Sequence, residues 1–385
     1  MEANLKDRYS RTPLSYAAEN GHTEVFDLIL RNSNTSINSQ DYMGLSALSY
    51  AAGGGHKEIV RMILACSDVD INSQNDYGWS ALSYAASGGY TDLFEIFLMH
   101  HNIIDLNPKD KDSRSLLSRA AEAGNIDLFK LLFRQLPFEI NSKDAHGRTP
   151  LLYAAMGGYI DLCEFLLGHP HLELHSKDLT GQTPLFYAAE GGHTDLCKVF
   201  VKHCTDIELN YKDKYGQTIL FHAAVWGHTA LCNLILKHGN IDVDCKNNLG
   251  RTPLSLAAQY GKTDSIMLLL EVSGIDLDSK DRHGRTSLSY AASEGREMIT
   301  RLLLDRNADV NSKNNDGRTP LIHAVRSSPL KRRTIELLVS QKGIEVNWKA
   351  NDRSSALSCA LKYTNSKYAD SRMEKLLRRY GAVGD

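Results

Sequence analysis

Histidines are the side chains of this sequence best suited to bind a metal, and one segment holds three of them close together. His169, His171 and His175 could serve as ligands, because imidazole binds zinc and other transition metals. They lie, however, in a link between two helical segments, and so do His100 and His101. We therefore interpret both groups as link residues and expect neither a metal nor a cofactor.

Cysteines are the second reactive group. The seven cysteines are an odd number, and none shows the Cys-x-x-Cys spacing of zinc or redox sites. Cys163, Cys197 and Cys232 recur at equivalent places in three similar segments, which favours small buried fillers of a core. Unpaired thiols are typical of a reducing compartment, so we expect an intracellular protein, cytoplasmic rather than nuclear.

Composition and motifs argue against several other functions. Lys and Arg number 44 against 46 Asp and Glu, a balance that does not favour nucleic acid as a partner. No run of apolar residues is long enough to span a membrane, and the first residues lack a signal-peptide core. The phosphate loop, the His-Glu-x-x-His zinc motif and the Gly-x-Ser-x-Gly nucleophile motif are also absent from the sequence.

The sequence instead repeats one helix–turn–helix pattern, which is most complete over residues 144–167. Asp144 and Gly147 are typical of a tight turn, because Asp bonds its local backbone and Gly accepts positive φ. Thr149 fits an N-cap, Pro150 the first helical position and Gly158 a left-handed helix end. The apolar stripe of a second helix follows at Leu162, Phe165, Leu166 and Leu167.

The capping residue of this pattern recurs along the chain at intervals of 33 to 36 residues. Its positions are Thr12, Ser46, Ser80, Ser115, Thr149, Thr183, Thr218, Thr252, Thr286, Thr319 and Ser355. We number the repeats one to eleven after these residues. Each repeat cannot bury its apolar faces alone, so neighbours must stack.

The period and the Thr-Pro-Leu core resemble the ankyrin repeat, with Ser in place of its usual His, as in Thr12-Pro13-Leu14-Ser15. This form of the repeat, with Ser in place of His, is similar to that of the long arrays found in filamentous fungi. The resemblance covers residues 1–385 and implies an all-α solenoid of stacked helix-turn-helix units with hairpin-like fingers. Repeats are regular over about 7–325 and irregular over about 326–385, with a modified link at 327–333 and extra residues at 363–370.

The resemblance implies a partner surface on the concave face, formed by the first helix of each repeat and the fingertips. The residues that we expect to contact a protein or peptide are Tyr42, Leu45, Tyr77, Trp79, Tyr215, Trp226, Tyr260, Arg282 and His283. Tyr50 and Tyr84 occupy the same face, where either partner contact or packing between helices would account for them. Trp226 is the most informative residue, because its position is solvent-facing and variable in the family.

Two functions are compatible with these residues. The first is a non-catalytic scaffold that binds proteins. The alternative is an enzyme or small-molecule binder with an aromatic groove pocket and an acid such as Glu122 or Glu190. A closed apolar pocket of ~300 Å³ with a perturbed carboxylate or histidine would favour the alternative, and an open solvated groove the scaffold.

Repeat four departs most from the pattern. Ser113 replaces the turn glycine, Leu116 the helix-starting proline and Arg119 the usual tyrosine. Either the stack tolerates a drifted member, or repeat four is a local soft point or bend, and a soft point would open early. Leu45 and Trp79 are also unusual, because they follow the turn glycine where the family commonly has a polar residue such as Arg.

Two further patterns concern the links and the ends. An apolar residue followed by Asn or Asp, as at Ile37-Asn38, leads into each finger, and we expect its polar side chain to bond nearby backbone. The last helix is basic, which suits a cap, whereas the second helix of repeat one is apolar. The first repeat begins abruptly, so a further hypothesis is that the chain is the recognition segment of a longer multidomain protein.

Overall fold

The computed structural model describes residues 4–31, 35–100, 104–203, 209–237, 240–327, 331–364 and 371–384. The chain divides into two compact units, an N-terminal unit (Met1–Gly191) and a C-terminal unit (Gly192–Asp385). The described residues form α-helices, one short 3₁₀-helix and connecting turns, with no named strand. The expectation of an all-α stack of helix pairs is therefore confirmed.

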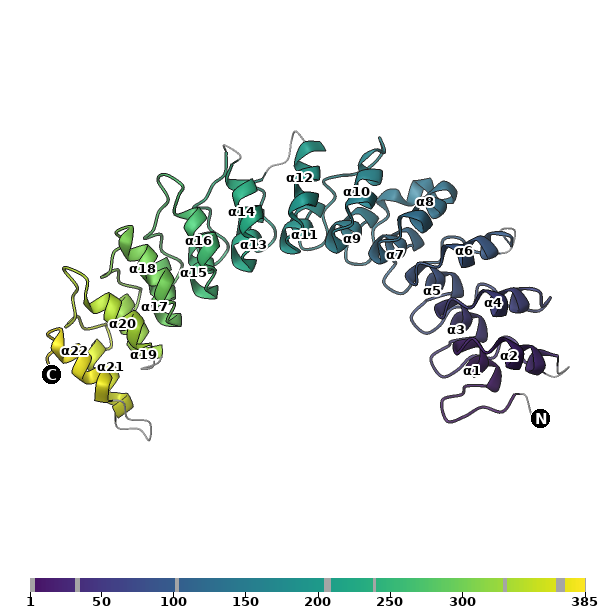
Figure 1. The fold of residues 1–385 in the computed structure, drawn as a ribbon, viewed down its shortest axis with the longest axis horizontal. Helices are drawn as coiled ribbons and strands as arrows, with labels where there is room; N and C mark the ends of the chain where they lie inside the picture. Colours follow the sequence, from purple (N-terminus) through teal and green to yellow (C-terminus); the bar gives the residue numbers. More distant parts are fainter. Residues whose placement is uncertain are drawn as a thin grey trace. The chain divides into compact units, whose positions relative to one another are not determined.

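In the N-terminal unit the first helices of successive repeats pack side by side, and the second helices form a second row along one side of them (Figure 1). The inner helices are α1 (Pro13–Glu19), α3 (Ala47–Gly53), α5 (Ala81–Ser87), α7 (Leu116–Ala123), α9 (Pro150–Gly157) and α11 (Pro184–Glu190). The outer helices are α2 (Thr23–Leu30), α4 (Lys57–Leu64), α6 (Thr91–Leu98), α8 (Ile126–Gln135) and α10 (Ile160–Leu167), and the 3₁₀-helix η1 (Pro137–Asn141) follows α8.

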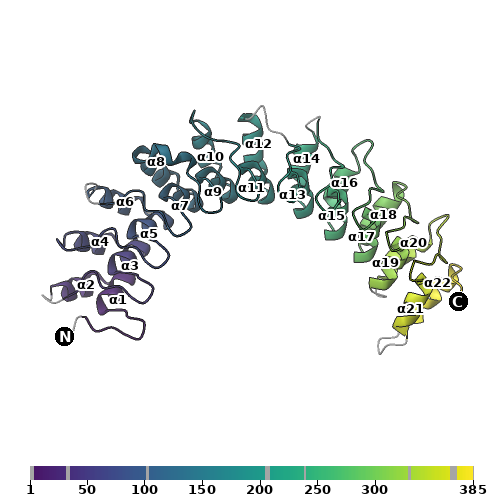
Figure 2. The ribbon, with the colours of Figure 1, turned by 180° about the vertical axis from the view of Figure 1, so that it is seen from behind.

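The C-terminal unit has the same two layers, seen from behind in Figure 2. Its inner helices are α13 (Ile219–Trp226), α15 (Pro253–Tyr260), α17 (Ser287–Glu294), α19 (Pro320–Ser327) and α21 (Ala356–Thr364). Its outer helices are α12 (Thr194–His203), α14 (Thr229–Leu236), α16 (Thr263–Leu269), α18 (Glu297–Asp305), α20 (Arg332–Val339) and α22 (Ser371–Arg379). Residues 328–330 of the irregular link and 365–370 of repeat eleven lie outside the described residues, as does His101.

The helix boundaries follow from the capping residues that the sequence repeats. Thr149 accepts a hydrogen bond from the Leu152 backbone N–H, Pro150 is the first residue of α9, and Gly158 ends it at φ 72°. Small buried residues such as Ala154 and Ala155 let the neighbouring inner helices approach closely. The local chemistry predicted for residues 144–167 is therefore confirmed.

Each repeat is preceded by a finger, which we define as the seven residues before the capping Thr or Ser. In the finger of repeat five, Asp144 Oδ1 accepts hydrogen bonds from the backbone N–H groups of His146 and Arg148, both at 2.8 Å. Gly147 takes φ 76°, which completes the turn. Consecutive fingertips are joined by backbone hydrogen bonds, such as Leu179 N–H to the His146 carbonyl at 2.9 Å.

The Asn that leads into the fingers joins neighbouring repeats, whereas we expected it to bond the backbone nearby. Asn38 donates from Nδ2 to the Asp68 carbonyl (2.6 Å) and accepts at Oδ1 from the Asp70 N–H (2.8 Å). Asn141 makes the same pair of bonds to His171 and Glu173. The role is structural, but it is exerted on the next repeat, because the asparagine side chain reaches the backbone of the following link.

Outer helices at the two ends of the described chain differ in polarity. On α2, Val25 and Leu28 are exposed and only Phe26 is buried. On α22, Met373 and Leu377 are buried, while the exposed side is basic and Arg378 pairs with Glu374. None of the described helices is long and apolar enough to cross a membrane.

Candidate partner-binding surfaces

The inner-helix face, formed by the inner helices and the fingers, is built on a bond between each turn acid and the helix that follows it. Tyr153 Oη donates to Asp144 Oδ2 at 2.6 Å, and Tyr187 donates to Asp178 at 2.7 Å. Burial and the bonded carboxylate raise the pKa of Tyr187 to about 12, so its phenol stays a hydrogen-bond donor at neutral pH. In the repeats that have this pair, the tyrosine therefore fixes the finger against its own helix.

A second contact joins several pairs of neighbouring repeats. The arginine just before the capping residue places its guanidinium over the tyrosine ring of the next inner helix. Arg11 lies 4.6 Å from the Tyr50 ring centroid, and Arg251 lies 4.1 Å from that of Tyr290. Such cation–π contacts add stability and set the spacing between repeats. They explain why Arg is frequent after the turn glycine.

Repeats three and four make the same contact with the two partners exchanged. Trp79 stands where other repeats have Arg, and Arg119 stands where they have Tyr; the Arg119 guanidinium lies 3.5 Å from the Trp79 ring centroid. Arg119 is 2% exposed and forms an ion pair with the turn residue Asp110, replacing the usual tyrosine–aspartate bond. Tyr84 completes the cluster, with its ring centroid 5.0 Å from that of Trp79.

This exchange bears on the two hypotheses for repeat four. Ser113 adopts φ 59°, so it holds the left-handed turn without glycine. Ser115 still caps α7 by accepting from Ser118 N–H, and the tip still bonds the preceding finger through Lys111 N–H and the Tyr77 carbonyl at 3.0 Å. Two unusual residues thus compensate each other, which favours an adapted repeat over a soft point.

The predicted residues of repeats two and three fall into two groups. Tyr42 and Tyr77 are exposed at the fingertips, 62% and 56% respectively. Leu45 and Trp79 are half-buried, and the Trp79 ring contacts Tyr84 and Arg119. The Tyr84 hydroxyl accepts a hydrogen bond from Asn75 Nδ2 at 2.9 Å. Packing within the chain therefore accounts for much of this first patch.

The predicted residues of repeats seven to nine are more accessible. Trp226 and Tyr260 are the last residues of the consecutive inner helices α13 and α15, and they are 54% and 53% exposed. The described fingertips of these repeats also expose Tyr215, Leu249, Arg282 and His283. We call this set, with Trp226 and Tyr260, the aromatic patch of the C-terminal unit.

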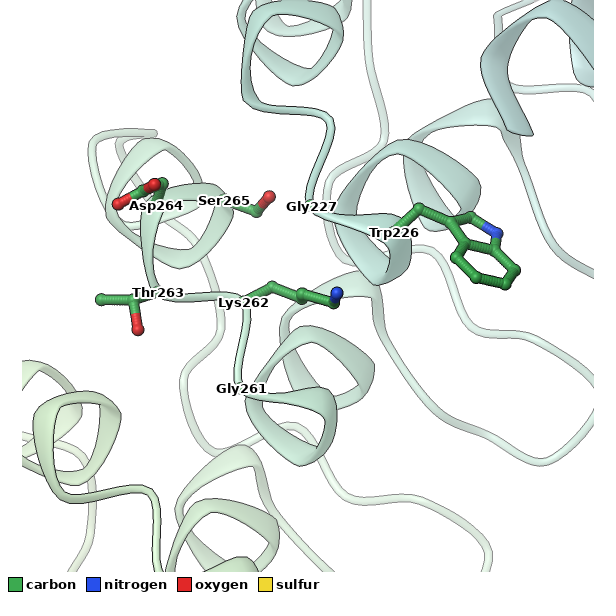
Figure 3. Close-up of a pocket in the computed structure, with 7 residues that line it drawn as sticks. All are labelled: Trp226, Gly227, Gly261, Lys262, Thr263, Asp264 and Ser265. Carbon is green, nitrogen blue, oxygen red and sulfur yellow. The ribbon is translucent and has the colours of Figure 1, made fainter. Parts of the chain in front are cut away.

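A hollow of about 310 Å³ lies beside Trp226. Its other lining residues are Gly227, Gly261, Lys262, Thr263, Asp264 and Ser265. Figure 3 shows the indole turned away from Asp264 and Ser265, while Lys262 extends toward Gly227. A Cβ at Gly227 would lie 3.2 Å from Lys262 Cδ, so the lysine stem packs on this glycine. The hollow is open and largely polar, and Asp264 is exposed.

Two of the side chains considered for catalysis or metal binding, Glu122 and His169, are engaged by other side chains. Glu122 is exposed and pairs with Arg114 at 3.2 Å, and Glu190 is partly buried. His169 packs its ring against Phe133 and Phe165. In the described parts of the chain, no three His, Cys, Asp or Glu side chains gather where they could hold a metal ion.

The three equivalent cysteines are buried in the outer layer, as predicted. Cys163, Cys197 and Cys232 are each at most 1% exposed. Burial raises the pKa of the first two thiols to about 12 and of the third to about 11. These thiols are therefore protonated and inaccessible at neutral pH, which is unsuited to a nucleophile.

A charge pattern that sequence reasoning missed distinguishes the arginines just before the capping residue, which follow the turn glycine or the serine that replaces it. Eight residues further on, at the end of the inner helix, repeats one and four carry Glu: Arg11 pairs with Glu19, and Arg114 with Glu122. In repeat eight Gln259 takes this place, and Arg251 Nη2 donates to its Oε1 at 2.7 Å. The spacing of eight residues between Arg and Glu, compared from repeat to repeat, is the sequence signal that could have revealed these pairs.

Comparison with known families agrees with the repeat period. The family model described as ankyrin repeats (three copies) matches residues 1–75, 64–144, 82–178, 151–247 and 239–314. These overlapping matches extend over most of the chain. No curated protein matches it.

Proposed function

Because the chain belongs to the ankyrin-repeat family, whose members are generally protein-interaction modules, we propose that it is a non-catalytic scaffold that binds a protein or peptide on its inner-helix face. The aromatic patch of the C-terminal unit is the centre of this binding surface. Tyr42 and Tyr77 would provide a secondary contact in the N-terminal unit.

The observation that carries the proposal is the exposure of Trp226 and Tyr260. Equivalent positions in repeats two to six hold Gly54, Gly88, Ala123, Gly157 and Gly191. Two large aromatic side chains on adjacent helices, more than half exposed, keep apolar area in water at an unfavourable ~25 cal/mol per Å². Burial against a partner would remove this cost, and Trp and Tyr are enriched at binding hot spots.

The alternative of an enzyme or small-molecule binder has less support. Its criterion was a closed apolar pocket with a perturbed acid or histidine, whereas the hollow beside Trp226 is open and its acid is exposed. Glu122, one of the two acids considered, is neutralised by Arg114. The ankyrin-repeat family is also generally non-enzymatic.

The proposal is tested by capturing partners from the source cell on the wild-type protein and on two variants. Trp226→Ala should lose the partners that the wild type retains. Met298→Ala is the matched control, because Met298 is 55% exposed but lies on the outer helix α18, so its variant should retain them. A purified partner bound equally by wild type and Trp226→Ala would contradict the proposal.

A further inference from the structure

The aromatic patch of the C-terminal unit adjoins two arginines that share one aromatic ring. The Arg251 and Arg285 guanidiniums lie 4.1 and 5.6 Å from the Tyr290 ring centroid. Arg251 also bonds Gln259, the neighbour of Tyr260 on α15. The two cations and the exposed aromatic residues are therefore parts of one continuous surface.

No carboxylate of the described residues pairs with either arginine. Asp281 is the acid that acts on Arg251 electrostatically, but it is buried and its oxygens serve its own finger. Oδ1 accepts from the N–H groups of His283 and Arg285, and Oδ2 accepts from Tyr290 Oη at 2.6 Å. The Glu that neutralises this arginine in repeats one and four is Gln259 in repeat eight and Ser293 in repeat nine.

The positive charge of Arg285 also acts on a buried histidine of the next repeat. His323 occupies the tyrosine position of repeat ten; burial, together with the Arg285 and Arg318 charges, lowers its pKa to about 4. Arg318, in contrast, is paired with Asp316 and Asp352. Arg148 of repeat five also lacks a carboxylate, but among the described residues repeats eight and nine are the two successive repeats whose arginines before the capping residue are both without one.

The fingers extend this positive character. The fingers of repeats seven to nine carry seven cations against two acids, both of them buried turn residues. Their cations are Lys212, Lys214, Lys246, Arg251, Lys280, Arg282 and Arg285. Lys212 and Lys246 each donate from Nζ to the carbonyl of the equivalent lysine in the next finger, at 3.0 and 2.9 Å. These bonds hold the charges in a row, one per repeat.

We infer that the partner bound at this surface is an extended acidic segment whose carboxylates pair with Arg251 and Arg285 while an apolar neighbour covers Trp226 and Tyr260. The inference rests on the proposed function and names the chemistry of its partner. A partner carboxylate would occupy the place that Glu19 and Glu122 take within the chain, and Arg binds carboxylates with charge-assisted hydrogen bonds.

The distance between the cations of successive repeats predicts how far apart the acidic residues of the partner segment should be. Adjacent packed helices lie roughly 10 Å apart, and an extended chain advances ~3.3 Å per residue. Acidic residues at every third position would therefore meet successive repeats. The acidic residue Glu294 stands at the Trp226 position in repeat nine, so the apolar anchor belongs beside repeats seven and eight.

Binding of two designed peptides to the full-length protein, measured by fluorescence anisotropy, tests this inference. One fluorescein-labelled peptide of about twelve residues has Glu at every third position and Leu between, and its twin has Gln in place of each Glu. The Glu peptide should bind the wild type about tenfold tighter or more, and added salt should reduce the difference. Equal binding of the two peptides, or binding of neither, would overturn the inference.

Three variants test whether the Glu peptide binds at Arg251. Arg251→Gln should weaken the Glu peptide about tenfold and leave the Gln twin unchanged. Gln259→Glu should weaken it similarly without lowering the thermal midpoint, because the chain would supply the carboxylate itself as in repeat one. Arg148→Gln is the matched control: Arg148 contacts the Tyr187 ring at 5.8 Å, but the next finger carries Gln182 instead of a second arginine. A loss in this control as large as in Arg251→Gln would contradict the assigned place.

Two outcomes separate this inference from the proposed function. If neither peptide binds but a captured partner needs Trp226, the scaffold proposal stands and the acidic segment is wrong. If Arg251→Gln weakens binding of the Glu peptide while Trp226→Ala weakens binding of no ligand, the proposal that the aromatic patch is the centre of the binding surface is wrong. A single-stranded RNA that binds as tightly as the Glu peptide and competes with it would show unspecific attraction of polyanions and overturn the inference.

Discussion

The aromatic surfaces of the two units use the same residue types in opposite ways. In repeats three and four, the chain itself satisfies Trp79 with Arg119, and Arg119 with Asp110. In repeats seven to nine, Trp226 is more than half exposed and the Arg251 charge lacks a carboxylate. The fingers of repeats two and three carry no cation, whereas those of repeats seven to nine carry seven. A tryptophan thus stabilises the stack when a side chain of the neighbouring repeat covers its ring, as Arg119 covers Trp79. It is available to a partner when its ring stays exposed, as in Trp226.

The largest effect is expected for the buried pair in repeat four. Arg119→Ala removes the closer of the two cations that pair with the buried Asp110 carboxylate and leaves Arg114 at 3.5 Å, so we expect a loss of about 3 kcal/mol, the lower end of the cost of breaking a buried pair. The N-terminal unit should therefore unfold at lower urea, and the amides of α7 should exchange faster. Circular dichroism and hydrogen-exchange mass spectrometry measure the two effects.

A double variant provides the control for this prediction. Trp79→Arg combined with Arg119→Tyr restores the arrangement of Arg11 and Tyr50 and should recover most of the lost stability. If the amides of α7 exchanged at the wild-type rate in Arg119→Ala, the ion pair of Arg119 and Asp110 would not be what holds repeat four together. The soft-point hypothesis would then regain support.

A smaller effect separates the two tryptophans directly. Trp79→Ala removes a half-buried ring with an aromatic and a cationic contact, so we expect a loss of about 2–3 kcal/mol, somewhat below the cost of truncating a fully buried Trp. Trp226→Ala should change stability by less than ~0.5 kcal/mol, as for ordinary surface substitutions. Urea unfolding of both variants measures this. A loss of several kcal/mol in Trp226→Ala would place its indole in the core.

The smallest effect concerns the ladder that links neighbouring repeats. Most described links use Asn, as at Asn38 in the N-terminal unit and Asn311 in the C-terminal unit, whereas two C-terminal links have Asp244 and Asp278 in its place. Asp244 Oδ2 accepts from Asp276 N–H, but its buried Oδ1 has no described partner. Asp244→Asn would provide a donor there, so we expect a gain of about 1 kcal/mol at neutral pH.

The pH dependence of that gain has a defined sign. Burial, aided by neighbouring aspartates, raises the pKa of Asp244 and Asp278 in the folded chain. The ionised form therefore destabilises the fold above the folded pKa, and this cost disappears as the pH falls toward the unfolded value of about 4. Thermal melts of wild type and Asp244→Asn should differ most at neutral pH and converge in acid. A constant difference would indicate that ionisation is not involved.

The sequence alone determined the local structure of this protein. Thr149, Pro150, Gly147 and Gly158 specify a capped helix, its turn and its end through interactions within a few residues, so their recurrence predicted the helix pairs. The exposure of Trp226 was also predictable, because its place at the end of an inner helix follows from the period. The equivalent cysteines were assigned to the core for the same reason.

Only the tertiary structure decided which unusual residues are free to bind. Trp79 and Arg119 are separated by one repeat and by a change of element, from finger to helix, so no local pattern pairs them. The sequence also did not show that Arg251 lacks a carboxylate partner. This became clear only from the structure, where its guanidinium contacts Gln259 and the Tyr290 ring. The physical reason is that the free energy of a side chain on this face depends on contacts within its own repeat and across to the next, which only stacking brings together.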